Sequence, residues 1–228
     1  MDKVVLSFSG GLDSTTLLYY LVAKYGKKNV FPVIVDYHQR HSIEMVCAKR
    51  TCKKLGVTPK LIDGSFLFSI VGNVTSMVVN DMATPTNPSE RMPTTYVPFR
   101  NGLFLMIMNS YAESIGANLV AIGLVREELQ NNKDEVRYWD TTEAFIKGMQ
   151  ALADLNDKHS IKYLAPFVSL TKEDEIRIGQ ELGIDYSSSW TCYNPQIEAV
   201  KTSYKDEPAG GKNPITLSLY KPCGVCPS

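Results

Sequence analysis

The chain has 228 residues, 44% of them hydrophobic, which is enough to bury the core of one α/β domain with a small appendage. Its 24 basic and 24 acidic side chains cancel, and this balance argues against broad, nonspecific binding of nucleic acid. No apolar targeting segment opens the chain and no uncharged apolar run is long enough to span a membrane, so we expect a soluble cytoplasmic protein.

Strand-like and helix-like segments alternate along the chain. Apolar runs predict strands at residues 3–8, 30–36, 58–63, 118–123 and 162–167, and residues 72–98 read as a long loop. Helical periodicity predicts helices at residues 14–25, 42–55, 101–115, 141–155 and 171–182. The helix at 101–115 is apolar on nearly every side, so we expect it to be buried. The alternation predicts an α/β fold with a doubly wound, mostly parallel sheet of about five strands, which binds ligands at the strands' carboxyl ends.

The segment after the first predicted strand carries the most information. Residues 9–14 read Ser-Gly-Gly-Leu-Asp-Ser, between a strand and a helix that opens with hydroxyl residues. Adjacent glycines let several backbone N–H groups point at one spot, and a helix N-terminus adds further donors. The pattern predicts a phosphate cradle, with an ordinary turn as the alternative. It is not a Walker loop, because no lysine follows the glycines.

Polar residues also follow the second predicted strand, at residues 36–41 (Asp-Tyr-His-Gln-Arg-His). The carboxylate of Asp36 could hold Mg²⁺ or a ribose, and the neighbouring rings and donors could contact a base. The alternative is an exposed loop with a chance cluster of basic residues.

Two cations stand at the starts of predicted helices, where the helix dipole disfavours positive charge. Arg100 in the string Val-Pro-Phe-Arg-Asn could bind a carboxylate or phosphate through paired hydrogen bonds, or could fold over a neighbouring carboxylate. For Lys172, a solvated side chain is the common explanation. Asp140 directly precedes the helix predicted at 141–155 and is a natural N-cap for it. Thr171 and Asp174 occupy capping positions of the helix predicted at 171–182.

The chain has five cysteines, and three of them lie near its C-terminus. Cys223 and Cys226 form a Cys-x-x-Cys knuckle, and Cys192 offers a distant third thiolate. This spacing favours a structural zinc site over disulfides, with free thiols as the alternative.

In this order, the segments resemble the 7-cyano-7-deazaguanine synthase (QueC) family of pyrophosphate-loop ATP pyrophosphatases. The resemblance is carried by residues 8–16, 36–41, 97–101, 122–123, 171–173 and 191–193 and by the final knuckle. The chain departs from the family pattern at His38, at residues 138–142, and in the long spacing between Cys192 and Cys223. Residues 194–219 therefore look like an insertion, and the family's fourth cysteine would fall just beyond Ser228.

The resemblance implies a pyrophosphate-loop ATP-binding domain at residues 1–190, of the adenine nucleotide alpha-hydrolase-like fold. A zinc-containing extension at 191–228 would follow. The resemblance also implies ATP, Mg²⁺ and structural Zn²⁺ as cofactors. The substrates would be the small molecules 7-carboxy-7-deazaguanine and ammonia, joined through adenylated acid and amide intermediates into the nitrile. Members of this family often form homodimers, so a homodimer is one expectation.

The resemblance also implies roles for individual residues. Asp13 and Arg100 are the expected catalytic residues, with Asp13 helping to place Mg²⁺. The expected nucleotide-binding residues are Phe8, Ser9, Gly10, Gly11, Leu12, Asp13, Ser14, Thr15, Asp36 and Gly123. The expected substrate-binding residues are Tyr37, Gln39, Arg40, Arg100, Asn101, Asp140 and Lys172. The expected zinc ligands are Cys192, Cys223 and Cys226.

Other functions stay open at this point. A related ligase could transfer the activated acid to another acceptor, such as a protein in an antiphage system. A different pyrophosphate-loop enzyme, such as a tRNA thiolase, or a non-catalytic nucleotide-binding protein would share the same loop.

Overall fold

The computed structural model describes residues 2–37, 42–71, 96–125, 138–186, 189–190, 196–206 and 212–221, the last two ranges as backbone. Among these residues, no helix is both long and apolar enough to cross a membrane.

A five-stranded sheet forms the centre of the molecule. Its strands are β1 (Val4–Ser7), β2 (Val30–Asp36), β3 (Lys60–Asp63), β4 (Leu119–Ile122) and β5 (Lys162–Leu164). They pair in the order β3-β2-β1-β4-β5, and every pairing is parallel. The predicted parallel sheet is therefore confirmed. In the central strand β1, Val4, Val5 and Leu6 are all 0% exposed, which is typical of a strand covered on both faces.

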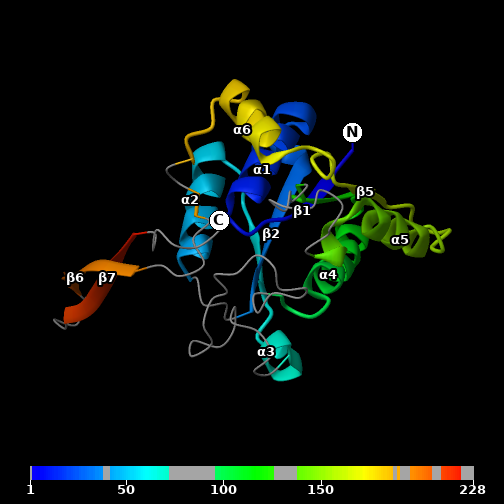
Figure 1. The fold of residues 1–228 in the computed structure, drawn as a ribbon. Helices are drawn as coiled ribbons and strands as arrows, with labels where there is room; N and C mark the ends of the chain where they lie inside the picture. Colours follow the sequence, from blue (N-terminus) through cyan, green and yellow to red (C-terminus); the bar gives the residue numbers. More distant parts are fainter. Residues whose placement is uncertain are drawn as a thin grey trace.

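Helices cover both faces of this sheet (Figure 1). On one face lie α1 (Leu12–Tyr25), α2 (Ser42–Leu55) and α6 (Lys172–Glu181), whose apolar side chains pack with Leu6. On the other lie α4 (Arg100–Ile115) and α5 (Glu143–Ala153), which pack with Val5. Because successive strand residues point to opposite faces, Val5 and Leu6 divide the core into these two layers.

Three expectations need correction. The helix at 101–115 is not buried on every side: α4 buries Leu105, Met108 and Ala112, while Met106 on its outer side is 42% exposed. The last strand ends at Leu164 rather than at residue 167, although Phe167 still packs in the core. The helix predicted from residue 141 begins at Glu143, after a short 3-10 turn η2 (Trp139–Thr141).

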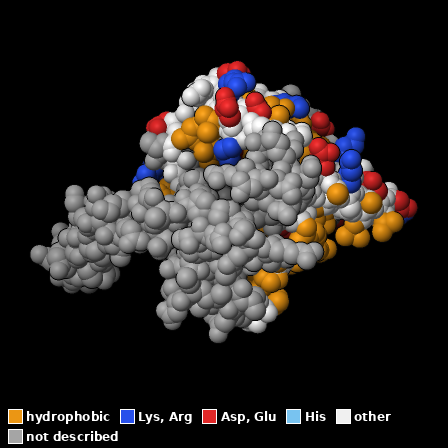
Figure 2. Space-filling view, in the orientation of Figure 1, with side chains coloured by type: hydrophobic (Ala, Val, Ile, Leu, Met, Phe, Trp, Pro, Cys, Tyr) orange, Lys and Arg blue, Asp and Glu red, His pale blue; other side chains and the backbone are white. Residues whose placement is uncertain are grey.

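Besides η2, four elements in the described ranges were not predicted. A 3-10 turn, η1 (Lys27–Asn29), and a short helix, α3 (Phe66–Val71), connect the predicted ones. Within the segment read as an insertion, β6 (Gln196–Asp206) and β7 (Lys212–Lys221) form an antiparallel hairpin, a sheet of its own that lies beside the main body in Figure 1. The surface view of Figure 2 shows acidic and basic side chains interspersed near α6, without a broad basic area among the coloured residues.

Candidate active site

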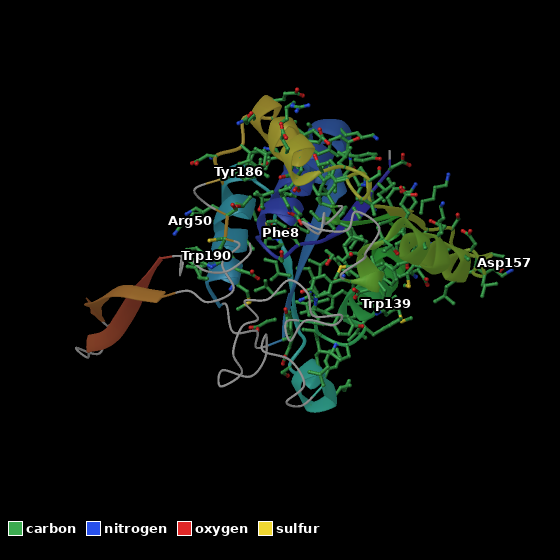
Figure 3. The ribbon with its side chains drawn as sticks, in the orientation of Figure 1. Phe8, Arg50, Trp139, Asp157, Tyr186 and Trp190 are labelled. Atoms are coloured by element: carbon green, nitrogen blue, oxygen red, sulfur yellow. The ribbon has the colours of Figure 1, made fainter. Side chains whose placement is uncertain are left out.

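The glycine loop between β1 and α1 has a backbone that only glycine can adopt. Gly10 has φ of +90°, and a Cβ there would lie 2.5 Å from the backbone oxygen of Glu44 and 2.8 Å from the nitrogen of Ala48. The loop is thus pressed against α2. From the other side, Trp190 N–H donates to the Gly10 carbonyl at 3.3 Å. In Figure 3, Trp190 and Trp139 lie on opposite sides of Phe8, which follows β1.

Donors in this loop converge on the Ser14 hydroxyl. Its Oγ accepts hydrogen bonds from the backbone N–H groups of Ser9 at 3.3 Å and Gly10 at 3.1 Å. Ser9 Oγ lies 3.1 Å from the same atom and also accepts from the Gly11 N–H at 3.2 Å. Gly11, the N-cap of α1, provides no side-chain cap for the helix. Donors gathered on one oxygen beside an uncapped helix N-terminus are what an anion needs.

Gly123, directly after β4, closes the loop from the neighbouring strand. A Cβ at this position would lie 2.9 Å from the Asp13 carbonyl carbon and 2.9 Å from the Ser14 nitrogen. The structure therefore brings together the carboxyl ends of β1 and β4 and the start of α1. This close approach needs a residue without a side chain.

Other expected nucleotide-binding residues take different positions. Phe8 is only 2% exposed and its side chain belongs to the core, so only its backbone is available to a ligand. The Thr15 hydroxyl is buried, and its Oγ1 has no hydrogen-bond partner among the described residues. Asp36 is the last residue of β2, and its carbonyl accepts from the Gly64 N–H at 2.6 Å.

Lys172 reaches the glycine loop from α6. Its Nζ forms an ion pair with Asp13 Oδ1 and lies 3.2 Å from Glu175 Oε2. Burial alone would lower the pKa of Lys172, but the carboxylates of Asp13 and Glu175 outweigh it and raise that pKa. Lys172 is therefore a half-exposed side chain that is also paired with two carboxyl groups. The predicted capping box of Thr171 and Asp174 is confirmed and fixes the start of this helix.

Glu175 belongs to this site and sequence reasoning missed it. It is 0% exposed, and burial together with the charge of Asp13 raises the pKa of its carboxyl group well above the usual range. A signal was available, because Glu175 shares the inner face of α6 with Ile178 and Gly179, where a charged residue is unexpected.

A second group of side chains surrounds Arg100, the first residue of α4. Its Nη1 donates to the hydroxyl of Tyr37 at 3.3 Å, and Tyr37 follows β2 directly. Glu44 on α2 faces the same guanidinium: burial raises the pKa of Glu44 to about 7, and the charge of Arg100 partly offsets this. The neighbouring carboxylate considered for Arg100 is therefore present. Glu44 was not among the expected site residues, because nothing in its sequence context marked it.

Asp140 caps a helix, but not the one expected. Its Oδ2 accepts from the Asn101 N–H at 3.4 Å, and Asn101 Nδ2 donates back to the Asp140 carbonyl at 3.1 Å. The N-cap of α5 is Thr142 instead, which accepts from the Phe145 N–H at 3.1 Å. Asp140 is 3% exposed; burial raises the pKa of its carboxyl group, and the Arg100 charge and the Asn101 hydrogen bond partly offset the rise.

Aromatic residues hold the start of α4. Phe99 has φ of +52°, and it is the one non-glycine residue with positive φ in the described ranges. Its ring packs on Trp139 at 5.5 Å between centroids and leaves no room for a side chain at Gly102. The Tyr96 hydroxyl accepts from the Phe99 N–H at 3.1 Å and from the Trp139 indole at 2.9 Å. These contacts fix the backbone from which Arg100 extends.

Several expected residues lie outside the described part of the chain: Gln39, Arg40, Cys192, Cys223 and Cys226. Among the residues that the structure does describe, no group of three or more His, Cys, Asp or Glu side chains could hold a metal ion. A single carboxylate at the loop, Asp13, is 34% exposed and offers the hard oxygen donor that Mg²⁺ prefers.

Comparison with known proteins places this site in a family. The family model described as "Queuosine biosynthesis protein QueC" matches residues 3–228. The chain belongs to the QueC family. It is 37% identical over 202 residues to a 7-cyano-7-deazaguanine synthase from Clostridium kluyveri, covering 85% of each chain. It is 34% identical over 200 residues to 7-cyano-7-deazaguanine synthase 1 from Colwellia psychrerythraea, covering 87% of each.

A solved structure confirms the fold of this QueC-family chain. The NH3-dependent NAD synthetase from Campylobacter jejuni superposes with a TM-score of 0.50 at 20% identity, covering 83% of this chain and 69% of the synthetase. At that identity the likeness concerns the fold alone. The family model and the curated relatives confirm, at the level of the family, the resemblance inferred from the motifs.

Proposed function

We propose that the protein is a ligase that converts 7-carboxy-7-deazaguanine and ammonia to 7-cyano-7-deazaguanine, with ATP cleaved to AMP and pyrophosphate. The observation that carries this proposal is the pairing of an anion-binding loop with an arginine cluster at one edge of the sheet. Relatives named as synthases at 37% and 34% identity support the same reaction.

The loop side suits a triphosphate. Backbone N–H groups of residues 9–11 and the start of α1 supply donors for phosphate oxygens, and Lys172 adds a positive charge. Asp13 would hold Mg²⁺, which supplies Lewis-acid stabilisation of the phosphate charge when bound. Gly123 leaves space for the backbone at the start of α1 to approach.

The arginine side suits the acid. The Arg100 guanidinium can bind the substrate carboxylate through paired hydrogen bonds, with Tyr37 and Glu44 fixing its orientation. Asn101 and Asp140 hold the first turn of α4 and so place Arg100. Gln39 and Arg40 follow Tyr37 in sequence and remain proposed substrate-binding residues.

The proposed reaction occurs between ATP bound at the glycine loop and the acid bound at Arg100. A carboxylate oxygen attacks the α-phosphorus of ATP and pyrophosphate leaves, which turns a poor electrophile into an acyl adenylate. Ammonia attacks the acyl carbon and AMP leaves, giving the amide after loss of a proton. The amide oxygen then attacks the α-phosphorus of a second ATP and pyrophosphate leaves. Loss of AMP and of the two remaining N–H protons gives the nitrile. The site contributes chiefly positioning and charge stabilisation.

A structural zinc ion bound by Cys192, Cys223 and Cys226 remains part of this proposal. A thiolate-rich site of this kind is closed, so the metal would stabilise the chain's last segment rather than take part in the reaction. Residues 1–190 would then form the ATP-binding domain and residues 191–228 the extension.

The test is product analysis by mass spectrometry. The protein is incubated with ATP, Mg²⁺, ammonium and 7-carboxy-7-deazaguanine, and the nitrile and AMP are quantified. We expect both, with AMP formation dependent on the acid. AMP accompanied only by adenylate or amide would instead indicate a ligase with another acceptor. No AMP under these conditions would contradict an enzyme of this class.

A further inference from the structure

A buried glutamate on α6 lies beside Lys172, the lysine that reaches the glycine loop. Glu175 is 0% exposed, and its Oε2 lies 3.2 Å from Lys172 Nζ. This is close enough for an ion pair, yet neither oxygen of Glu175 accepts a well-directed hydrogen bond from any described residue. Burying a carboxyl group whose oxygens lack well-directed hydrogen bonds is costly in either protonation state, so this side chain is not explained by packing alone.

Lys172 is shared between two carboxylates of different exposure. Asp13 belongs to the loop and is 34% exposed, whereas Glu175 is fully buried. One ammonium group contacts both, so it has two anchor points that are already formed. Moving between them requires a change of side-chain rotamer and no movement of the helix.

Packing between α1 and α6 fixes the relative positions of Asp13, Lys172 and Glu175. The Tyr186 hydroxyl lies 2.8 Å from Thr16 Oγ1 on α1. The same hydroxyl rests on α6 at Gly179, where a Cβ would lie 1.7 Å from it. Tyr186 therefore links α6 to α1. This link restricts changes in the distance between Glu175 on α6 and Asp13 on α1.

Asp13 has a competing task. The carboxylate that now pairs with Lys172 is the one that would hold Mg²⁺, and a divalent cation on it repels the nearby ammonium. Binding of magnesium–ATP is therefore expected to drive Lys172 away from Asp13. An ammonium released into solvent would no longer be beside the phosphates, whereas one retained by Glu175 would be.

We propose that Glu175 is a positioning residue that retains Lys172 when magnesium–ATP takes Asp13, so that the ammonium stays beside the phosphates without competing with the metal. This inference rests on the proposed function. It assigns the buried carboxylate a role that needs no contact with the nucleotide.

The test measures ATP affinity by calorimetry while Mg²⁺ is varied. In Glu175→Gln, which preserves size, Lys172 loses its second anchor and stays on Asp13. We expect the Mg²⁺ concentration that gives half-maximal ATP binding to rise about tenfold, as for loss of one coupled charged contact. The matched control is Glu181→Gln, which makes the same substitution at an exposed position on α6 and leaves this midpoint unchanged.

Repeating the measurement in a Lys172 variant distinguishes an effect of Glu175 through Lys172 from a direct effect on the metal. In Lys172→Met there is no ammonium to compete, so adding Glu175→Gln should no longer move the Mg²⁺ midpoint. An equal shift in both backgrounds would overturn the proposal, because Glu175 would then act on the metal directly. No shift in either would overturn it too. If Glu175→Gln does not fold by circular dichroism, Glu175→Asp, which shortens the reach, should show the same rise. Failure of the unsubstituted protein to bind ATP would contradict the proposed function as well.

Discussion

The glycine loop and the arginine cluster are built in opposite ways. The loop is a short contiguous segment in which backbone N–H groups are the proposed phosphate donors and glycines leave room for close packing. The arginine cluster gathers Tyr37, Glu44, Arg100 and Asp140 from four separate elements. A backbone site tolerates change outside its glycines, whereas a side-chain site depends on each charge. The difference explains why ATP chemistry is easier to recognise here than the identity of the acid.

The largest effect should come from breaking the loop's backbone. In Gly10→Ala, a Cβ 2.5 Å from the Glu44 oxygen adds to the strain of φ +90°, for a loss of about 3 kcal/mol in the free energy of unfolding. ATP binding should be lost with it. Urea unfolding and calorimetry measure both quantities.

Gly116→Ala is the control for this change. Gly116 has a positive φ of +64° in the left-handed helical region, but nothing lies within 4 Å of the added Cβ. It should cost only about 1–2 kcal/mol and leave ATP affinity intact. Equal losses in the two variants would mean that the loop's packing against α2 does not matter.

The next effect isolates the arginine cluster. Arg100→Lys keeps the charge but removes the planar pair of donors, so kcat/KM for the acid should fall about 100-fold. The Kd for ATP should change little, because the phosphates bind at the loop. Arg50→Lys, at an exposed position on α2 (Figure 3), is the matched control. A comparable loss of ATP affinity in Arg100→Lys would show that Arg100 also contributes to ATP binding, so that the loop and the arginine cluster do not act separately.

A smaller effect separates positioning from simple helix capping. Asp140→Asn weakens the cap of α4 and should cost about 1 kcal/mol of stability, with a fall in kcat/KM for the acid. Thr142→Ala removes the cap of α5 for a similar loss of stability and should leave kcat/KM unchanged. If both variants lower kcat/KM equally, Asp140 contributes stability alone.

A last effect depends on pH. Burial raises the pKa of Glu44 from about 4.5 to about 7, so the folded protein binds this proton more tightly than the unfolded chain. The stabilising effect of the proton is complete below pH 4.5 and is lost as the pH rises through 7, up to about 3 kcal/mol.

Glu44→Gln removes this dependence. The variant should gain stability relative to the unsubstituted protein between pH 5 and pH 8, as read from urea midpoints at each pH. A difference in midpoint that stays constant across this range would show that Glu44 titrates normally and does not bear on Arg100.

Much of the fold could be predicted because its signals are local. The alternation of elements gave the parallel sheet, and the capping residues Thr171 and Asp174 marked the start of α6 correctly. The hairpin of β6 and β7 was missed, because its segment was read by composition as an insertion rather than by strand alternation.

The site could be predicted only in part, for a physical reason. The glycine loop could be recognised because its residues, 9–14, are contiguous in the sequence. Arg100 and Lys172 could be recognised because each is a cation at the start of a helix, where the helix dipole disfavours positive charge. Glu44 and Glu175 acquire their properties from burial, which depends on how helices pack. Asp140 was assigned to the wrong helix, since its partner Asn101 approaches only in the folded chain.

The proposed reaction activates the same carbon twice at one site. The most direct measurement follows AMP, amide and nitrile together over time, starting from the acid or from the amide. We predict one AMP when the acid becomes the amide and a second when the amide becomes the nitrile, with the amide accepted as a substrate. Nitrile formed with a single AMP, or an amide that is never consumed in the presence of ATP, would contradict this reaction sequence.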